Sequence, residues 1–363
     1  MRKECIIIKN DIKARTNLSV RGKEQLKIDT YDQLLKKITG RIECGVAKAA
    51  DEIRKSQLAT YWDAGRYIVE YEQNGKKHAE YGLELLKKLA TDLTLRFGRG
   101  YSRPNLYNMR KFYQLYPGGY EEISLLTWSH VCELIRIEDE VERQFYTNQC
   151  IDEKWNVRTL QRQKKSALFL RLATTKNKNE ILALAKHGIE IDKPEDIVKN
   201  TYTLEFLQLN NEAWFSETEL EQKIIDNLQS FLMELGKGFT FVKQQYPINI
   251  NNKVYHCDLV FYHRILKCFV LIDLKIDDVQ HEDVGQMNMY MGYFAMEENE
   301  QDDNPPIGII LSRNKDELLI KYSTYGMESN LFVSKYELYL PDVEELKRIV
   351  NNTMDGADES ESV

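Results

Sequence analysis

The sequence has few of the features that mark disulfide-stabilised, zinc-binding or membrane proteins. Its six cysteines are scattered without a C-x-x-C pair, which argues against a zinc ribbon or a disulfide framework and fits a reducing cytoplasm. No H-E-x-x-H pair occurs among the six histidines. The apolar run at positions 5–8 is too short for a signal peptide, and no stretch approaches the length of a membrane span. We therefore expect a cytoplasmic protein without a membrane partner.

Charge is abundant and unevenly divided along the chain. Residues 1–200 hold 37 Lys and Arg against 28 Asp and Glu, a net charge of +9. Residues 201–363 hold 13 against 29, a net charge of −16. A basic half joined to an acidic half suggests that one end binds a polyanion while the other concentrates carboxylates. Ordinary charged helix surfaces would explain the same counts equally well.

The hydrophobic pattern predicts two domains of different kinds. The first shows apolar residues at spacings of three and four, which is typical of helices. The second reads as a helix, three strands, a helix and a strand, followed by a final strand and helix, which predicts a mixed sheet flanked by helices. The expected parts are an N-terminal arm (1–29), an all-helical domain (30–175), a connector (176–212), the mixed-sheet domain (213–350) and a disordered acidic tail (351–363).

Several helix ends can be placed from local signals. One helix presents an apolar stripe that ends at Phe97 and stops at the glycines that follow. Ser102 is a natural N-cap for the next helix, and Pro104 lies in its first turn. Ser216 and Glu219 form a capping box at the start of the second domain.

Charged residues stand at the end of an otherwise apolar strand in the stretch HCDLVFYHRILKCFVLIDLK, positions 256–275. Side chains on a strand alternate between faces, so Asp273 and Lys275 point the same way. If the flanking strands pair around a turn at Ile265 and Leu266, Asp258 lies opposite Asp273. Because CFVLI reads as a doubly buried strand, a charged cluster at its end indicates a functional site more than a surface ion pair.

Two neighbouring carboxylates repel, and an arrangement that keeps both ionised usually includes a cation. Hard cations such as Mg²⁺ prefer carboxylate, carbonyl and water oxygens. A lysine beside them can hold a nucleophilic water or offset charge that builds up on a phosphate. Asp258, Asp273 and Lys275 therefore have the chemistry of phosphodiester hydrolysis.

The order of these residues resembles the PD-(D/E)XK nuclease superfamily, and specifically the bacterial YhcG-type nucleases. The segments YWDAGRYIVEYEQNG and LTWSH in the first domain look like the same family, so the resemblance covers about residues 30–345. One departure is that this chain has Asp-Leu-Lys where the family usually has Glu-Leu-Lys, which must bring a metal nearer the strand. The matching residues are Glu221, Asp258, Asp273, Lys275, Gln286 and Tyr290.

The resemblance implies a restriction-endonuclease-like fold and a metal-dependent nuclease, most simply a DNA endonuclease. It implies that Asp258 and Asp273 hold Mg²⁺ or Mn²⁺, helped by Glu221 and the carbonyl of Leu274. Gln286 would support Lys275 or the phosphate. Without the resemblance, Glu221 reads as a first-turn glutamate that favours the helix dipole, and Gln286 reads as a solvated helix residue.

The first domain contains a basic stretch in which arginines alternate with tyrosines, positions 96–116. A helix, a glycine-rich turn and a second helix make a helix-turn-helix-like reader of nucleic acid, with arginines on phosphates and asparagines on base edges. Basic helices that only solvate a bundle are the alternative. The candidate nucleic-acid-binding residues are Arg96, Arg99, Arg103, Asn105, Asn108, Arg110 and Lys111.

Two other functional classes remain open from the sequence. One is a protein that binds branched DNA or RNA without cutting it, and the other is a module whose helical half binds protein. The complete acid-acid-lysine set argues against the first, and the positive charge of the N-terminal half argues against the second. The sequence does not decide between DNA and RNA, and it leaves open whether the protein is a homodimer.

Overall fold

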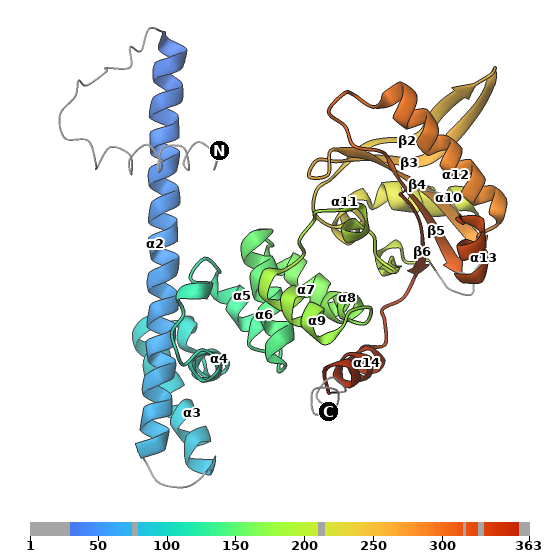
Figure 1. The fold of residues 1–363 in the computed structure, drawn as a ribbon. Helices are drawn as coiled ribbons and strands as arrows, with labels where there is room; N and C mark the ends of the chain where they lie inside the picture. The colour runs from blue at the N-terminus through green and yellow to red at the C-terminus, as the bar shows by residue number, and fades with distance from the viewer. Residues whose placement is uncertain (1–29, 75–78, 210–214, 315–316, 326–329, 356–363) are drawn as a thin grey trace. The chain divides into compact units, whose positions relative to one another are not determined.

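The structure is a computed structural model that describes residues 30–74, 79–209, 215–314, 317–325 and 330–355 (Figure 1). The chain divides into two compact units, Met1–Arg136 and Ile137–Val363, which are described separately below. The predicted arm over 1–29 lies outside the described residues, as does most of the predicted tail. Within the described ranges, every helix is too short or too polar to traverse a lipid bilayer.

The described residues of the first unit form helices and turns only, as predicted for the helical domain. Helix α4 packs against α2, and Gly65 allows this approach because a side chain there would collide with the carbonyl oxygen of Met109. Leu58, Leu106 and Phe112 are completely buried. The helices are α2 (Tyr31–Asn74), α3 (Ala79–Phe97), α4 (Arg103–Leu115) and α5 (Trp128–Leu134), with single turns η1 (Arg99–Tyr101) and η2 (Glu121–Ile123).

The turn between α3 and α4 follows its sequence signals. Gly98 ends α3 with a φ of +89°, a conformation that glycine adopts at little cost. Ser102 is the N-cap of α4 and Pro104 lies in its first turn, although the Ser102 hydroxyl makes no capping hydrogen bond. The prediction for Phe97 was wrong, because its side chain is 68% exposed and meets the Tyr101 ring instead of the core.

The second compact unit starts at Ile137, within the stretch predicted as the helical domain. Four helices before the sheet belong to it, and α6 packs on α9 within this unit. Helix α14 (Val343–Asp355) packs on α8 and continues into the stretch expected to be a disordered tail, so 351–355 are helical. The four earlier helices are α6 (Glu140–Asp152), α7 (Val157–Lys165), α8 (Leu168–Ala173) and α9 (Lys178–His187).

The expected connector over 176–212 is largely ordered structure. It contains α9, the single turns η3 (Pro194–Ile197) and η4 (Glu205–Leu207), and the short strand β1 (Thr201–Thr203). Strand β1 pairs in parallel with β6 and buries Tyr202 completely. The short apolar stretches in this segment therefore supply an edge strand and part of the core.

The sheet is mixed and has six strands in the order β1-β6-β5-β4-β3-β2. Strands β2, β3 and β4 are antiparallel neighbours, whereas β4, β5, β6 and β1 run parallel. The fold class predicted from the sequence is therefore confirmed. The remaining strands are β2 (Phe239–Ile250), β3 (Lys253–His263), β4 (Cys268–Asp278), β5 (Ile307–Asn314) and β6 (Leu331–Glu337).

Helices cover both faces of this sheet (Figure 1). Helices α10 (Glu217–Asp226) and α11 (Leu228–Leu235) pack on one face, where Ile272 of β4 is buried. Helix α12 (His281–Tyr293) packs on the other face with Leu271, and α13 (Glu317–Ser323) contacts α12. The short π-helix η5 (Phe294–Glu298) continues α12. Strand β4 is thus buried on both faces, as its apolar sequence predicted.

Candidate active site

The register of β3 and β4 brings two aspartates together. The paired residues run from His263 opposite Cys268 to Leu259 opposite Ile272, which confirms the predicted register. The next position along the ladder places Asp258 opposite Asp273. Each of these two carboxyl groups affects the pKa of the other.

Asp258 is held by one backbone and one side-chain donor. The backbone N–H of Leu274 donates to Asp258 Oδ2 at 2.8 Å, and the amide nitrogen of Gln245 donates to Asp258 Oδ1 at 3.0 Å. Burial, followed by the neighbouring Asp273 carboxylate, raises the pKa of Asp258 to about 7. At neutral pH this carboxyl group therefore exchanges a proton readily, and a bound cation would displace that proton.

Asp273 and Lys275 form an ion pair in which the aspartate is buried and the lysine is partly exposed. Lys275 Nζ lies 2.8 Å from Asp273 Oδ2, and the whole Asp273 residue is only 4% exposed. Burial raises the pKa of Asp273, while Lys275 works against that rise. Burial lowers the pKa of Lys275, but the Asp273 carboxylate outweighs it and leaves that pKa raised. Lys275 therefore stays protonated at neutral pH.

Lys275 also lies near two acidic residues that the sequence did not single out. Its Nζ is 3.8 Å from Glu217 Oε2 at the start of α10 and 3.7 Å from Asp283 Oδ1 in the first turn of α12. In the sequence, the acidic stretch 276–283 that contains Asp283 could add ligands, but a solvated loop is the simpler interpretation. The only available signal was its position directly after the strand that carries Lys275.

Glu221 reaches the cluster through Gln245. The Gln245 amide nitrogen donates to Glu221 Oε2 at 2.7 Å and to Asp258, so it links the two carboxyl groups. Gln245 has a φ of +47°, a left-handed conformation that is uncommon for a residue other than glycine. Nothing about a glutamine within a strand indicates this role, and sequence reasoning missed it.

The other carboxylate oxygen of Glu221 has no hydrogen bond from any described residue. Glu221 is 7% exposed, and its Oε1 atom is buried without a hydrogen-bond partner. Burial raises the pKa of Glu221 despite the hydrogen bond from Gln245. An unpaired buried acceptor is costly, and a cation or water bound beside it would remove that cost.

Gln286 and Tyr290 share one face of α12, as their spacing predicted. The Tyr290 hydroxyl donates to the His256 carbonyl oxygen at 3.0 Å, and the Gln286 amide nitrogen donates to the Tyr290 hydroxyl. The contact of Gln286 in this structure is therefore with Tyr290, whereas the sequence suggested support of Lys275 or a phosphate. Tyr290 is 1% exposed and fixes α12 to the end of β3.

The donor set fits a hard divalent cation that keeps part of its water shell. No three His, Cys, Asp or Glu side chains among the described residues converge into a ready-made metal-binding group. Mg²⁺ is usually bound by one or two carboxylates and retains several waters, so a complete protein cage is not required. Asp258 and Asp273 supply the pair, and the unpaired Glu221 Oε1 is an acceptor beside them.

Asp258 should make the stability of the metal-free protein depend on pH. Its pKa is about 7 in the folded chain against an ordinary value of 3.8, so this group stabilises the fold below about pH 4. That contribution is lost as the pH rises through 7. The free energy of unfolding of the wild type should therefore fall between pH 5 and pH 8. In Asp258→Asn this fall should be smaller by about 2 kcal/mol.

Urea titrations in excess chelator at both pH values measure this difference. Asp302→Asn, which changes an exposed aspartate of the same unit, is the matched control and should behave like the wild type. An unchanged pH dependence in Asp258→Asn would contradict the raised pKa.

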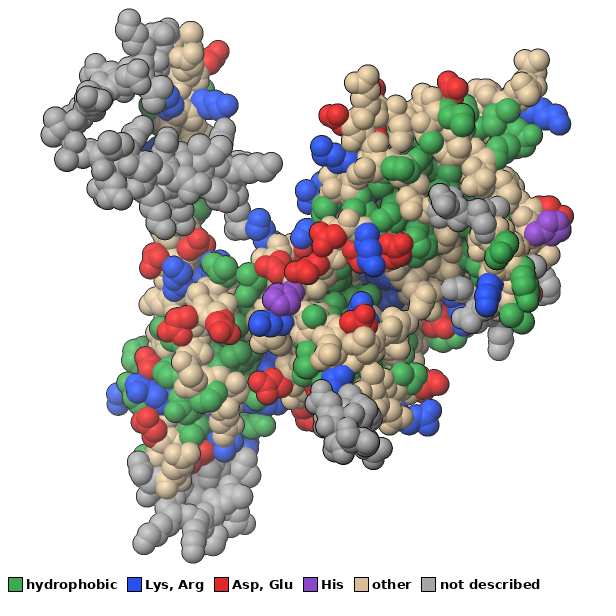
Figure 2. All heavy atoms as spheres, viewed as in Figure 1, with side chains coloured by type: hydrophobic (Ala, Val, Ile, Leu, Met, Phe, Trp, Pro, Cys, Tyr) green, Lys and Arg blue, Asp and Glu red, His purple; other side chains and the backbone are tan. Residues whose placement is uncertain are grey.

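The candidate nucleic-acid-binding residues of the helical unit fall into two groups. Arg96, Arg99 and Arg103 are exposed around the turn between α3 and α4, and Lys111 is half-buried. Arg110 instead makes an ion pair with Glu72 of α2 at 2.7 Å. Basic and acidic side chains of this unit are interspersed on the face drawn in Figure 2. The exposed arginines at the turn are therefore the better candidates for phosphate contact.

Both candidate base-reading asparagines have contacts within their own unit. Asn105 accepts a hydrogen bond from Trp128 Nε1 at 2.7 Å and donates to the Gly100 carbonyl oxygen. Asn108 Nδ2 lies 3.5 Å from Cys132 Sγ. Asn105 therefore ties η1 to α5 in this conformation, a structural role that its sequence context did not indicate.

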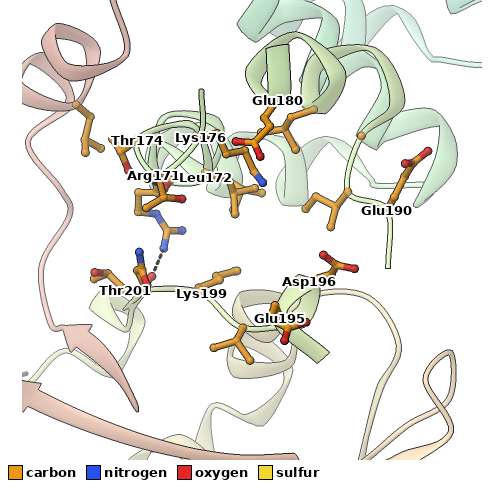
Figure 3. Close-up of a pocket in the computed structure, with 18 of the residues that line it drawn as sticks. Arg171, Leu172, Thr174, Lys176, Glu180, Glu190, Glu195, Asp196, Lys199 and Thr201 are labelled. Atoms are coloured by element: carbon orange, nitrogen blue, oxygen red, sulfur yellow. Dashed lines mark hydrogen bonds between the residues drawn. The ribbon is translucent and has the colours of Figure 1, made fainter. Parts of the chain in front are cut away.

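A cavity of about 700 Å³ lies apart from the carboxylates, beside α8, α9 and the segment leading into β1 (Figure 3). Its wall mixes basic side chains such as Arg171 and Lys199 with acidic ones such as Glu180 and Asp196. Arg171 Nη1 donates to the Thr201 carbonyl oxygen at 3.1 Å, the bond drawn in Figure 3. The carboxyl groups of Glu221, Asp258 and Asp273 do not line this cavity.

Comparison with known proteins identifies both parts of the chain. Residues 195–351 match the model of the YhcG PDDEXK nuclease domain, and residues 37–171 match the DUF1016 N-terminal domain. A protein of Escherichia coli (strain K12) described as "Putative nuclease YhcG" is 31% identical over 348 residues, which cover 87% of this chain and 92% of that protein.

Two solved structures match the chain in part. One is described as "crystal structure of a repair endonuclease from Pyrococcus abyssi", with 20% identity over 36% of this chain and a TM-score of 0.25. The other is described as "Structure of EndoMS-dsDNA2 complex", with 16% identity over 37% of this chain and a TM-score of 0.25. The match spans 50% of each of those chains. With both domain models and the full-length relative in agreement, the chain belongs to the YhcG family of PDDEXK nucleases.

Proposed function

We propose that the protein is a metal-dependent nuclease that hydrolyses phosphodiester bonds in DNA. The observation that carries this proposal is the meeting of two neighbouring carboxyl groups, Asp258 of β3 and Asp273 of β4, with the partly exposed ammonium group of Lys275. Membership of the nuclease family adds support. The free thiols of the five described cysteines fit a cytoplasmic location, which stays part of the proposal.

Each residue of the cluster has a distinct task in this proposal. Asp258 and Asp273 would hold Mg²⁺ or Mn²⁺, with the unpaired Glu221 Oε1 and the Leu274 carbonyl as further oxygen donors. When bound, such a cation polarises the phosphate and lowers the pKa of a bound water. Gln245 keeps Glu221 and Asp258 in place from the side.

Lys275 acts as a charge and a hydrogen-bond donor, not as a base. Its raised pKa keeps the ammonium group protonated at neutral pH, so it cannot accept a proton from water. It can donate to the attacking water and to the phosphate oxygens on which negative charge develops. Its hydrogen bond with Asp273 fixes the direction in which Nζ points.

Metal dependence is tested by incubating the purified protein with end-labelled DNA in linear, branched and single-stranded forms, with RNA in parallel. Cleavage of DNA is expected with Mg²⁺ or Mn²⁺ and should stop in excess chelator. Ca²⁺ should bind without supporting turnover, because an all-oxygen site accepts it with longer and less regular bonds. Full cleavage in chelator would contradict the proposal, and binding without cleavage under every condition would favour a non-cleaving nucleic-acid-binding protein.

The turn between α3 and α4 is the proposed phosphate-contacting surface. Replacing Arg99 and Arg103 together with Gln should weaken DNA binding for all sequences. The slope of log affinity against log salt should flatten by about 0.9 for each phosphate that the variant no longer neutralises, or about 1.8 for the pair. Titrations of labelled duplex at several salt concentrations measure both quantities.

Arg136→Gln is the matched control, because this arginine is 64% exposed in the same unit and lies outside the turn. It should leave the salt slope unchanged. Equal salt slopes for the wild type and the double variant would show that Arg99 and Arg103 do not contact the DNA phosphates.

A further inference from the structure

The N-terminal part of α2 carries an apolar face that the described residues do not cover. All of its large apolar side chains between residues 31 and 53 are at least 40% exposed. Isolated helices gain most of their stability by packing an amphipathic face against a neighbour. The exposed side chains are Tyr31 (74%), Leu34 (40%), Leu35 (49%), Ile38 (49%), Ile42 (60%), Val46 (66%) and Ile53 (72%).

The apolar residues follow one regular repeat. Their spacings of four, three, four, four, three and four make an 11-residue period, which is the pattern of nearly straight or right-handed helical pairs. At about 100° per residue the repeat keeps them within an arc of about 80°. The repeat consists of Tyr31, Leu35, Ile38, Ile42, Val46, Ala49 and Ile53.

Farther along α2, residues at positions of the same repeat pack against other helices. Continued by 11 residues it reaches Ala64, Ile68 and Tyr71, which line one cavity together with Leu85 and Leu89 of α3. Ile68 is buried there and belongs to one core with Leu89. The polar residues at 57 and 60 separate the covered part of this apolar stripe, the surface formed by the repeat, from the uncovered part at residues 31–53. The uncovered part is therefore shaped for a second helix.

Charges beside the stripe select the orientation of that helix. Arg41 and Lys48 lie on one side, whereas Asp32 and Glu43 lie on the other together with Lys36. Glu52 on the basic side is engaged by Lys55 at 3.4 Å. In a parallel pair of identical helices, the basic side of each meets the acidic side of its partner, whereas an antiparallel pair brings like sides together. The stripe is thus complementary to a parallel copy of itself.

We propose that residues 31–53 of α2 form a parallel helical pair with the same segment of a second copy of this chain. Each copy then covers the apolar face of the other, as residues of α3 and α4 cover Ile68 farther along the same helix. This interface goes beyond the proposed nuclease activity and does not depend on it.

Sedimentation equilibrium of the full chain tests the association. The wild type should be a dimer at micromolar concentration, and Ile42→Glu should raise the dimer dissociation constant at least about 100-fold because it buries two like charges. Ala47→Glu, on the opposite exposed face, is the matched control and should remain a dimer. Far-UV circular dichroism shows whether Ile42→Glu stays helical, and Ile42→Asn provides a milder variant.

A cysteine cross-link tests the orientation. Two copies of residue 49 are neighbours in a parallel pair, but lie about 20 Å apart in an antiparallel pair centred on Ile42. Mild oxidation of Ala49→Cys should therefore give a covalent dimer in higher yield than Ala47→Cys or the wild type, since a disulfide needs close Cα atoms. A monomeric wild type, a dimer that tolerates Ile42→Glu, or no added cross-linking through residue 49 would each overturn the proposal.

Discussion

Lys275→Met should slow DNA cleavage by about 10²–10³-fold. The Lys275 ammonium group lies 2.8 Å from Asp273 and keeps its charge because its pKa is raised. Methionine preserves the length and apolar stem of the side chain but removes that charge. The change therefore weakens the stabilisation of charge at the phosphate and the placement of the attacking water.

Single-turnover rates at saturating Mg²⁺ and DNA measure this effect. Lys321→Met, an exposed lysine of α13 in the same unit, is the matched control and should cleave at the wild-type rate. A melting temperature close to that of the wild type shows that the fold is retained. A rate within about threefold of the wild type would exclude Lys275 from the chemistry.

Glu234→Gln should destabilise the second unit by about 3–5 kcal/mol. Glu234 is completely buried in α11, where its carboxylate accepts from Arg171 at 2.9 Å and from the backbone N–H of Thr203 at 3.1 Å. Lys199 Nζ lies 3.4 Å from the same carboxylate. Burial raises the pKa of Glu234, but the charges of Lys199 and Arg171 outweigh it and lower that pKa. The variant therefore leaves buried cations without their counter-ion.

Urea unfolding of Glu234→Gln against the exposed control Glu300→Gln measures this destabilisation. Adding Arg171→Met to Glu234→Gln should recover part of the stability, because the second change removes one of the stranded charges. If Glu234→Gln costs less than about 1 kcal/mol, or if the two changes are simply additive, the buried cluster does not hold α8, β1 and α11 together.

Local signals predicted the parts of the site that depend on strand geometry. The turn at Ile265 and Leu266 sets the register that places Asp258 opposite Asp273, and side-chain alternation puts Lys275 on the side of Asp273. The capping box at Ser216 is also present, with the Ser216 hydroxyl accepting from the Glu219 N–H at 3.1 Å. These features follow from the spacing of residues along the chain, which can be read without knowledge of the tertiary structure.

Features set by packing between distant segments were not predictable in the same way. Gln245 links Glu221 and Asp258 only because β2 adopts a left-handed residue at that point, and nothing in the residue type signals it. The helical pattern fades near residue 175, which predicts a domain boundary there. The compact units of the structure divide at Arg136 and Ile137, because α6–α9 pack within the sheet-containing unit, whereas the matched N-terminal family domain extends to residue 171.

The sequence also could not show which basic residues of the stretch 96–116 are exposed and which form ion pairs within the protein. Arg110 and Arg103 have the same charge and lie seven residues apart, yet Arg110 pairs with Glu72 while Arg103 is exposed. The difference depends on α2, which lies about forty residues earlier and packs against α4. Only the tertiary arrangement separates a phosphate-contacting candidate from a structural ion pair.

Cleavage of an end-labelled DNA duplex by Asp258→Asn tests most directly whether the carboxylate pair of Asp258 and Asp273, on neighbouring strands β3 and β4, performs the chemistry. Asparagine keeps the shape of the side chain and an oxygen for the Leu274 N–H, but it removes the charge that a cation requires. With Mg²⁺ present, the wild type and Asp302→Asn should cut the duplex, while Asp258→Asn should bind it without cutting. Cleavage by Asp258→Asn at the wild-type rate would contradict the assignment.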